Sequence, residues 1–579
     1  MEMHGVAKIL GDIGVLLELK GESPFKSRAY YSAARIIEMI GEDELEKLVR
    51  EDKLKEVKGI GAALDEKLKE LVLTGRLPYY EELKASVPEG LFEILKVPGL
   101  GPRKVSALYE TLEITTLAEL EYACRENRLV NLKGFGLKTQ QNILEGIEFL
   151  RRYQGRYFYS EAHRIALVLL ERVMEFPAIG EASLAGSIRR CLEIVKDIDL
   201  VASTAEPDQL THYFAELPSV TEVTALGETK VSVQLKEGIN ADLRVVEPNQ
   251  YPYALHHFTG SREHNTALRS RAKSMGMKIN EYGLFREDEL IECHTENEFF
   301  AALGLAFIEP ELRENSGEIE AAEAGTLPLL VKEADIRGIF HVHTTYSDGA
   351  DSLDDIVRGC RDAGFEYIGI SDHSQSAFYA GGLQADDLKR QREEILSLCE
   401  KYPEIAIYCG VESDIKTDGS LDYPDQVLEE LDFVIASVHS GLKMERRKMT
   451  ERVIRAVSNP YVTILGHPTN RLLLGRDSSP LDIEQVFEAA LEHNVILELN
   501  ANPARLDLDW RYLKKVRNMG LLVSINPDAH QVEGFGDTAF GVAIARKGWL
   551  EAKDVFNSRS REDVDAYLKK RKAKAGRAR

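Results

Sequence analysis

The chain has 579 residues, 44% hydrophobic and 29% charged, a composition typical of a globular protein that is too long for a single core. No apolar run is long enough to cross a bilayer and no secretory signal is recognisable, so we expect a cytoplasmic protein. The formal net charge of −23 excludes a broad basic surface for indiscriminate nucleic-acid binding but allows local contacts. The six cysteines form no Cys-x-x-Cys pair, which predicts free thiols.

The first 150 residues are predicted to be helical and carry one turn pattern three times. In each copy an apolar residue stands between two glycines, with amphipathic helical segments on both sides. The copies are Gly59-Ile60-Gly61, Gly99-Leu100-Gly101 and Gly134-Phe135-Gly136. The glycines let the turn approach a phosphate, and the next helix start offers unpaired N–H groups. The pattern resembles the helix-hairpin-helix module, so we predict that these glycines contact the DNA backbone without reading its sequence.

The stretch 186–201, GSIRRCLEIVKDIDLV, combines phosphate-binding residue types with a pair of carboxylates. Its apolar end favours a strand, in which Asp197 and Asp199 point to the same face. Two carboxylates this close are unfavourable unless a divalent cation neutralises them. Gly186, Ser187 and the arginines 189 and 190 suit phosphate. Asp242, in the next β-like run 241–246, adds the third carboxylate that two-metal phosphoryl chemistry needs. The stretch therefore predicts nucleotidyl transfer.

The motifs that follow resemble the X family of DNA polymerases in order and spacing. The Gly-Ser and Asp-x-Asp motifs alone would indicate the wider nucleotidyltransferase superfamily, and two further motifs narrow it to polymerases: Phe258-Thr259-Gly260-Ser261 and Asn280-Glu281-Tyr282. The resemblance implies a palm in which two Mg²⁺ or Mn²⁺ ions are held by Asp197, Asp199 and Asp242. It also implies a site for a deoxynucleoside triphosphate (dNTP) formed by Gly186, Ser187, Arg190, His257, Phe258, Gly260, Asn265 and Arg269.

Two residues depart from the pattern of animal members of the family. His257 stands in place of a tyrosine where the sugar is screened, which leaves sugar discrimination open. Asn240 stands in place of an arginine two residues before Asp242, which leaves open how that carboxylate is held.

The family's N-terminal domain can also carry a lyase that removes a 5′-deoxyribose phosphate through a lysine Schiff base. Lys67 falls at the matching position, and Lys26 and Tyr30 match accompanying positions. The resemblance therefore implies Lys67 as a candidate lyase nucleophile, and an ordinary lysine on an exposed helix face is the alternative.

From residue 338 onward, seven short β-rich runs alternate with helical segments, which predicts a parallel sheet closed into a barrel. Histidines and carboxylates follow the ends of these runs, where βα-barrels gather their chemistry, and such ligands suit Zn²⁺, Mn²⁺ or Fe. The pattern, which opens with His341-Val342-His343, resembles the polymerase-and-histidinol-phosphatase (PHP) metalloesterase domain. The resemblance implies about three ions, with Glu412 bridging, on nine ligands: His341, His343, Asp348, His373, Glu412, His439, His467, Asp528 and His530.

The predicted fold class is multidomain: all-α helix-hairpin-helix domains, an α/β palm and thumb, and a distorted (β/α)7 barrel. The predicted domains are a lyase-like hairpin domain (1–85), hairpin fingers (86–150), the palm (151–255), the thumb (256–317), a linker (318–333) and the PHP domain (334–579). The two resemblances together imply a bacterial or archaeal X-family polymerase with a C-terminal PHP domain.

We therefore expect a monomeric, template-directed gap-filling DNA polymerase of base excision repair, which binds dNTPs and gapped or primer–template DNA. The barrel is expected to supply a metal-dependent 3′–5′ exonuclease or other 3′-end processing, with apurinic endonuclease cleavage as a further candidate activity. Two alternatives stay open. One is a template-independent nucleotidyltransferase, which has no use for three DNA-backbone hairpins; the other is a small-molecule phosphoesterase with a polymerase-like binding module.

Overall fold

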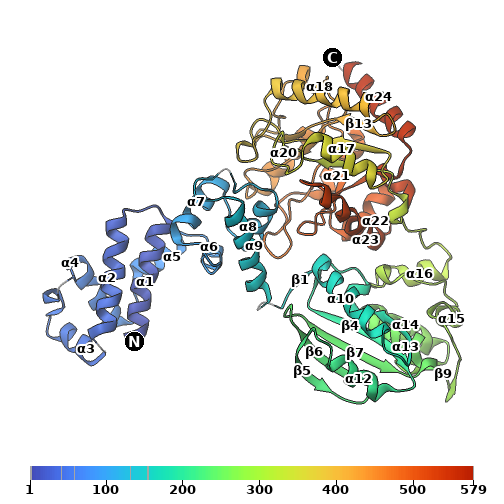
Figure 1. Cartoon of the computed structure of the whole chain (residues 1–579), viewed down its shortest axis with the longest axis horizontal. Coiled ribbons are helices and arrows are strands. Elements are labelled where there is room, and N and C mark those ends of the chain that lie inside the picture. The colour runs from blue at the N-terminus through green and yellow to red at the C-terminus, as the bar shows by residue number, and fades with distance from the viewer. Residues whose placement is uncertain (1–2, 41, 58, 131, 153–154, 578–579) are drawn as a thin grey trace. The chain divides into compact units, whose positions relative to one another are not determined.

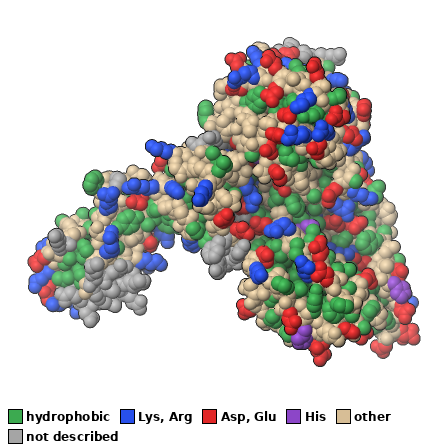
Figure 2. Space-filling view, in the orientation of Figure 1, with side chains coloured by type: hydrophobic (Ala, Val, Ile, Leu, Met, Phe, Trp, Pro, Cys, Tyr) green, Lys and Arg blue, Asp and Glu red, His purple; other side chains and the backbone are tan. Residues whose placement is uncertain are grey.

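The computed structural model describes residues 3–40, 42–57, 59–130, 132–152 and 155–577, which form two compact units, Met1–Leu150 and Arg151–Arg579 (Figure 1). Among these residues no helix combines the length and the apolar character that a membrane span requires. The six cysteines are all free. On the visible face of the second unit, acidic and basic side chains are interspersed (Figure 2).

The first unit is built from helices around one hydrophobic core. The helices are α1 (Met3–Leu19), α2 (Pro24–Ile40), α3 (Glu42–Arg50), α4 (Ala62–Thr74), α5 (Pro78–Ala85), α6 (Gly90–Ile94), α7 (Pro102–Leu112), α8 (Leu117–Arg125) and α9 (Leu137–Arg152). Proline at the first position of α5 and α7, and a capping box between Thr116 and Glu119 at the start of α8, fix where these helices begin. Buried side chains form one cluster from Val6 to Ile147, so no separate cores divide the unit near residue 85.

The palm is a five-stranded mixed sheet in the order β2-β4-β7-β6-β5. Its strands are β2 (Ile179–Leu184), β4 (Asp197–Thr204), β5 (Val220–Leu226), β6 (Lys230–Leu235) and β7 (Asn240–Val246). Strands β4 and β7 run parallel, and the other pairs are antiparallel. The helices α10 (Tyr159–Met174) and α12 (Pro207–Ala215) cover the face that carries Ile198, Leu200 and Ala202. The alternation of β4 therefore leaves Asp197 and Asp199 on the opposite face.

The thumb contains α13 (Tyr251–Thr259), α14 (Arg262–Ser274), α15 (Glu296–Ala302) and a three-stranded sheet of β8 (Met277–Asn280), β9 (Gly283–Arg286) and β10 (Glu289–Leu290). The segment 318–333, expected to be a linker, begins with a helix, α16 (Glu318–Glu323). Ile319 and Ala322 of this helix join the thumb core, and Glu318 Oε1 lies 2.7 Å from His264 Nδ1. The acidic and alanine-rich residues at the start of this segment form a short amphipathic helix that packs on the thumb. The connection between thumb and barrel therefore begins after α16.

The third part of the chain is a barrel of parallel strands, which confirms the expected fold. The strands are β11 (Gly338–Val342), β12 (Tyr367–Ile370), β13 (Ala406–Cys409), β14 (Glu412–Asp414), β15 (Ile435–Ser437), β16 (Ile464–Leu465), β17 (Ile496–Asn500) and β18 (Val523–Asn526). One of the seven β-rich runs, residues 406–411, forms β13, which pairs with β12, and a separate strand, β14, begins at Glu412 and pairs with β15. Bridges His373–Glu412 and Val342–Ala529 link the two resulting sheets.

The barrel shares its packing with the palm and the thumb. Phe540, on α23 (Thr538–Lys547), packs edge-on against Tyr159 of the palm at a ring-centroid distance of 6.0 Å. Trp549, two residues after that helix, is 5% exposed and belongs to the thumb core. Arg471 of the barrel forms ion pairs with Glu193 of the palm and with Asp509. The barrel therefore meets the palm and the thumb through apolar contacts as well as an ion pair.

Candidate active sites

Three carboxylates converge on the open face of the palm sheet. In the parallel pairing of β4 with β7, Asp199 lies opposite Asp242 and Asp197 lies opposite Asn240. The residues between them, Ile198 and Ala241, are fully buried on the other face. The side-by-side arrangement of Asp197 and Asp199 expected from the alternation is therefore present, and the sheet adds Asp242 to it.

The palm carboxylates create a strong negative potential. The pKa of Asp199 is raised to about 6, because burial penalises its charged form and because Asp197 and Asp242 lie close by. Lys230 Nζ on β6 lies 2.8 Å from Asp242 Oδ2 and pairs this carboxylate with a cation, whereas Asn240, two residues before Asp242, is neutral. Carboxylate oxygens alone are the ligands that hard ions such as Mg²⁺ prefer, so the donor set fits a divalent ion.

The phosphate-binding residue types lie against this triad. Gly186 has a φ of +59°, and a Cβ atom on it would lie 1.9 Å from Asp199 Oδ2, so the position has no room for a side chain. The hydroxyl of Ser187 is buried and has no hydrogen-bond partner among the residues that the structure describes. An unpaired buried donor is costly, and a phosphate oxygen would satisfy it.

The two arginines of the motif have different partners. Arg189 donates to Thr259 Oγ1 (2.6 Å) and to Glu296 Oε2 (2.5 Å). Arg190 donates through Nε to Glu314 Oε1 (3.0 Å) and through Nη1 to the carbonyl oxygen of Thr259. Both side chains are thus held by a carboxylate and by the FTGS segment.

The remaining predicted dNTP residues lie together at the start of the thumb. Asn265 Nδ2 donates to the carbonyl oxygen of His257 (2.8 Å), and Arg269 Nη2 lies 3.4 Å from His257 Nδ1. Burial lowers the pKa of His257, and the Arg269 cation acts in the same direction. Phe258 packs between the His257 ring, at 4.9 Å, and the Arg244 guanidinium of β7, at 5.2 Å. A Cβ atom on Gly260 would lie 3.1 Å from Arg190 Nη1, which connects this group to the arginine.

The Asn280-Glu281-Tyr282 motif forms the turn between β8 and β9. Asn280 Oδ1 accepts hydrogen bonds from the backbone N–H groups of Tyr282 and Gly283, both at 3.0 Å. Tyr282 is 54% exposed, so the turn presents this ring to solvent.

In the barrel, Glu412 lies at the centre of a buried cluster of histidines. Its Oε1 atom lies 3.2 Å from His341 Nε2, 3.2 Å from His439 Nε2 and 3.1 Å from His467 Nε2. Its Oε2 atom lies 2.8 Å from His373 Nδ1. Although burial alone would raise it, the pKa of Glu412 is held well below its usual range by His439, His341 and His373.

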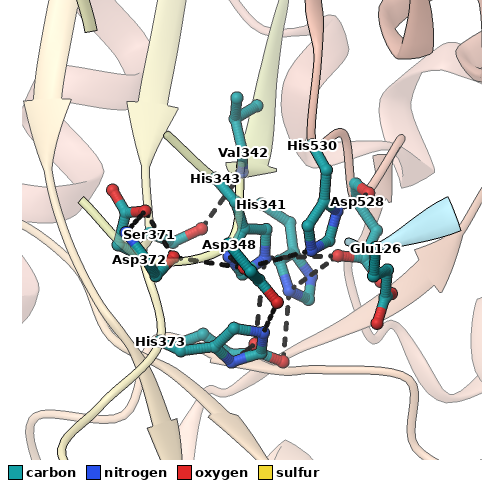
Figure 3. A network of polar contacts seen from close by, with 12 residues as sticks. Glu126, His341, Val342, His343, Asp348, Ser371, Asp372, His373, Asp528 and His530 are labelled. Atoms are coloured by element: carbon teal, nitrogen blue, oxygen red, sulfur yellow. Dashed lines mark hydrogen bonds and ion pairs between the residues drawn. The ribbon is translucent and has the colours of Figure 1, made fainter. Parts of the chain in front are cut away.

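Two further carboxylates complete the cluster. Asp348 lies 3.5 Å from His373 and 3.4 Å from His530, and Asp528 lies 3.4 Å from His341 and 3.3 Å from His343. Figure 3 shows the rings of His343, His373 and His530 close to one another beside Asp348. Eight of the nine residues predicted as ligands fall in overlapping groups whose ligand atoms lie within 4.8 Å of one another, and the ninth, His467, lies 3.1 Å from Glu412.

The chemistry of this cluster fits divalent metal ions. His341 Nε2 and both ring nitrogens of His343 are buried without a hydrogen-bond partner among the described residues. Burial and the neighbouring rings of His530 and His373 lower the pKa of His343 to about 3, so its imidazole is neutral, as a ligand must be. Backbone strain gathers at the same residues, because His341, His467 and Asp528 have positive φ angles of 59°, 24° and 53°.

Several residues that orient the cluster were not predicted. Glu498 Oε1 accepts from His341 Nδ1 (2.6 Å), and Asp414 Oδ1 lies 2.6 Å from His439 Nδ1. Such contacts fix the tautomer and ring orientation of a ligating histidine. Asp372 accepts from the backbone N–H groups of Thr344 and Ser347 and so shapes the loop that carries Asp348. One sequence feature could have identified Glu498: it is an acidic residue inside the apolar strand run VILELN (495–500), where a charged side chain is buried.

The three glycine turns of the first unit share one geometry. The first glycine of each has a positive φ, 104° at Gly59, 83° at Gly99 and 91° at Gly134. The apolar residue between the glycines is buried, with an exposed fraction of 4% or 6%. A Cβ atom on the second glycine of each turn, Gly61, Gly101 or Gly136, would meet no atom within 4 Å. Each turn therefore offers an open backbone surface at the start of a helix.

The predicted lyase lysine lies in a small aromatic site of the first unit. Lys67 on α4 donates to the hydroxyl of Tyr30 (2.8 Å), and its Nζ lies 3.7 Å from the centre of the Tyr79 ring. Lys26, the other matching residue, is an exposed cation 3.4 Å from Glu22. Tyr30 and Lys67 are thus brought together, although they are 37 residues apart in sequence.

Models of four domain families match the chain. They describe a helix-hairpin-helix domain (residues 1–77), a SAM-like helix-hairpin-helix tandem (92–148), the DNA polymerase beta thumb (254–314) and the PHP domain (340–502). Polymerase and PHP domains imply the use of divalent metal ions, in agreement with the buried cluster of the barrel.

Relatives match either the whole chain or the barrel alone. The DNA polymerase/3′-5′ exonuclease PolX of Bacillus subtilis is 40% identical over 574 residues, which cover 98% of this chain and all of that protein. A probable phosphatase of a Thermoanaerobacter species is 29% identical over 255 residues, 41% of this chain and 96% of that protein. A crystal structure of Leishmania infantum polymerase beta aligns with 22% identity over 39% of this chain and all of that one, with a TM-score of 0.26. Sequence identity over the full length shows that the chain belongs to the PolX family, the X-family DNA polymerases with a C-terminal PHP domain.

Proposed function

We propose that this protein is a template-directed, gap-filling DNA polymerase of base excision repair that also degrades DNA from the 3′ end. The observation that carries the proposal is the presence of two different sites in one chain, a carboxylate-only triad beside phosphate-binding residues and an imidazole–carboxylate cluster in a barrel. Similarity to PolX over the full length supports the combination. The glycine turns supply a means of holding DNA by its backbone.

In the palm, Asp197 and Asp199 would hold both Mg²⁺ or Mn²⁺ ions, and Asp242 would bind the ion next to the primer 3′-hydroxyl. Bound there, divalent ions would stabilise the negative charge that develops on the transferred phosphoryl group. Gly186, Ser187 and Arg190 would hold the triphosphate. This assignment is supported by the buried, unpaired hydroxyl of Ser187 and by the close approach of Gly186 to Asp199.

At the thumb, Asn265 and Arg269 would contact the nascent base pair, and His257, Phe258 and Gly260 would face the sugar. The proposal is supported by the contacts that His257 makes with Asn265 and Arg269, which place these polar groups within one small region.

In the barrel, the nine clustered residues would hold about three ions, and Zn²⁺, Mn²⁺ and Fe suit their mixed ligands. Glu412 would bridge, because four histidines contact its carboxylate. Glu498 and Asp414 would keep His341 and His439 in the tautomer that leaves Nε2 directed at the cluster.

The test of the proposed function follows one labelled primer on a gapped duplex. With dNTPs and Mg²⁺ the primer should extend across the gap in the order of the template, and without dNTPs it should shorten from its 3′ end. Extension that ignores the template would instead indicate a template-independent nucleotidyltransferase. A duplex with a single abasic site, included in the same series, tests for apurinic endonuclease cleavage.

The barrel's similarity to a probable phosphatase favours a second candidate, a phosphoesterase for small molecules. A generic phosphomonoester such as p-nitrophenyl phosphate distinguishes the two. The second candidate requires faster turnover of this compound than of a DNA 3′ end at equal metal concentration, and we expect the opposite.

The glycine turns predict an effect on DNA affinity alone. Replacing Gly101 with valine should weaken binding to a gapped duplex by about tenfold without changing sequence preference, because the new side chain points into the open space that a phosphate would occupy. Fluorescence anisotropy at fixed salt measures this. Gly11→Val in α1 is the matched control, since a Cβ atom there also meets nothing within 4 Å. Unchanged affinity in the Gly101 variant would reduce the turns to helix connections.

The aromatic site around Lys67 predicts a lyase. Borohydride should trap the protein covalently on DNA that bears a 5′-deoxyribose phosphate, and Lys67→Ala should remove the trapped species. Lys69→Ala is the control, because Lys69 lies on the same helix but pairs with Asp52 and Asp65. If the parent protein is not trapped, Lys67 is only a structural partner of Tyr30.

A further inference from the structure

A lysine of the barrel is buried beside the proposed triphosphate site. Lys547 is the last residue of α23, and its side chain has no exposed surface. Its ammonium group donates to Glu314 Oε1 (2.6 Å), to the carbonyl oxygen of Arg190 (2.9 Å) and to the carbonyl oxygen of Glu311 (3.3 Å). A buried charge is tolerated only when it is paired, and these three contacts supply the partners of the Lys547 ammonium group.

One carboxylate oxygen is shared by two cations. Glu314 Oε1 accepts both from Lys547 Nζ, at 2.6 Å, and from Arg190 Nε, at 3.0 Å. The Glu314 and Arg190 side chains are 15% and 12% exposed, so solvent screens the pair only weakly. If Glu314 had Arg190 as its only partner, the carboxylate would largely cancel the guanidinium charge. With Lys547 present, the three groups together carry one net positive charge.

The other arginine of the motif has the same kind of neighbourhood. Glu296 pairs with Arg189 at 2.5 Å and with the fully buried Arg313 at 2.6 Å. Two cations share one carboxylate here as well, but these three residues all belong to the palm and thumb. Only the group around Arg190 takes its second cation from the barrel, and Lys547 also fixes the Arg190 backbone through the carbonyl oxygen.

We propose that Lys547 is a positioning residue for the polymerase: as the second cation on Glu314, it leaves the guanidinium of Arg190 its positive charge for the incoming triphosphate. The inference rests on the proposed role of Arg190 in dNTP binding. It gives the barrel a part in nucleotide binding that is separate from its own metal cluster.

The test measures steady-state single-nucleotide incorporation on a gapped duplex with the full-length protein. Lys547→Met should raise the KM for dNTP about tenfold, the effect expected when a charge-assisted contact in a phosphate site is lost, and should change kcat much less. Lys547→Gln keeps a hydrogen-bond donor without the charge and should give a similar rise, which provides a second variant if methionine is not tolerated. The double variant Lys547→Met with Glu314→Gln removes both charges and should return KM toward the parent value.

Lys514→Met is the matched control. Lys514 also reaches from the barrel to the thumb region, where its Nζ donates to the carbonyl oxygen of Ser316 (2.7 Å), but it does not contact Glu314 or Arg190 in the structure. Thermal unfolding and 3′ degradation should be close to the parent in all variants that fold. A rise in KM that is equal in the Lys514 variant, or that grows in the double variant, would indicate a purely structural role and overturn the proposal.

The variant Arg190→Ala distinguishes a failure of the proposed triphosphate site from a failure of the proposed role of Lys547. If it raises KM while both Lys547 variants leave KM unchanged, the proposed function stands and the role of Lys547 is wrong. If Arg190→Ala itself leaves KM unchanged, the assignment of Arg190 to the triphosphate fails, and the role of Lys547 fails with it.

Discussion

Replacing Asp242 with asparagine is expected to lower nucleotide incorporation by about 10³-fold while DNA affinity stays nearly unchanged. Asp242 lies opposite Asp199 in the sheet, and the variant removes one of three charges while it keeps the size of the side chain. Loss of a ligand to the catalytic ion costs several kcal/mol of transition-state stabilisation, and about 4 kcal/mol corresponds to that factor. The affinity should persist, because the glycine turns that are proposed to hold the DNA backbone belong to the other unit.

Single-turnover incorporation on a gapped duplex, at saturating dNTP and Mg²⁺, measures the effect, and anisotropy measures the affinity. Asp208→Asn is the matched control, because Asp208 lies in α12 with a 65% exposed side chain outside the triad. Ordinary incorporation by the Asp242 variant would rule out the triad as the polymerase site.

Replacing His341 or His530 with alanine is expected to abolish 3′ degradation while Mg²⁺-dependent extension continues. Each histidine belongs to one group of the barrel cluster, and these groups share His343 and His373, so the loss of either His341 or His530 leaves one ion site a ligand short next to the others. The palm cluster contains only carboxylates and takes none of its ligands from the barrel. Asp197→Ala combined with Asp199→Ala should give the reverse result, with degradation retained and extension lost.

The comparison uses one labelled gapped duplex, with Mg²⁺ and then with Mn²⁺. Bound metal is measured on the purified proteins and should fall in the two histidine variants. His493→Ala is the control, since His493 lies in the barrel at the end of α21 (Ile483–His493) and outside the cluster. If the histidine variants still degrade the 3′ end while the palm double variant does not, degradation belongs to the polymerase site.

Local patterns sufficed to predict the framework of both sites. The alternation in DIDLVAS places two carboxylates on one face because strand geometry has a period of two, and the next β-run adds Asp242 through a single parallel pairing. In the barrel, the ends of parallel strands meet at one mouth, so histidines far apart in sequence were expected to meet there. In both cases the rule is independent of the details of side-chain packing.

The residues that could not be predicted depend on contacts over long sequence distances. Glu498 lies 157 residues from His341, and nothing in either segment identifies the partner of the other. Lys547 stands in the last turn of a helix, a position where a basic residue is common on protein surfaces because it complements the helix dipole. Lys547 is buried once α23 packs on the palm, where its ammonium group contacts the carbonyl oxygen of Arg190. These two residues are 357 positions apart in the sequence.

The barrel side chains that pack in the palm and thumb cores also limit how the parts of this protein can evolve separately. Phe540 packs against a palm residue and Trp549 completes the thumb core, although both belong to the barrel part of the chain. Exchange of the barrel for one without these side chains would remove Lys547 as well, and would leave cavities in the apolar cores and Glu314 with one cation instead of two. A domain on a free tether can be lost or replaced in one genetic step. This barrel can be replaced only by a sequence that already carries the matching side chains, so polymerase and barrel are expected to diverge as one unit.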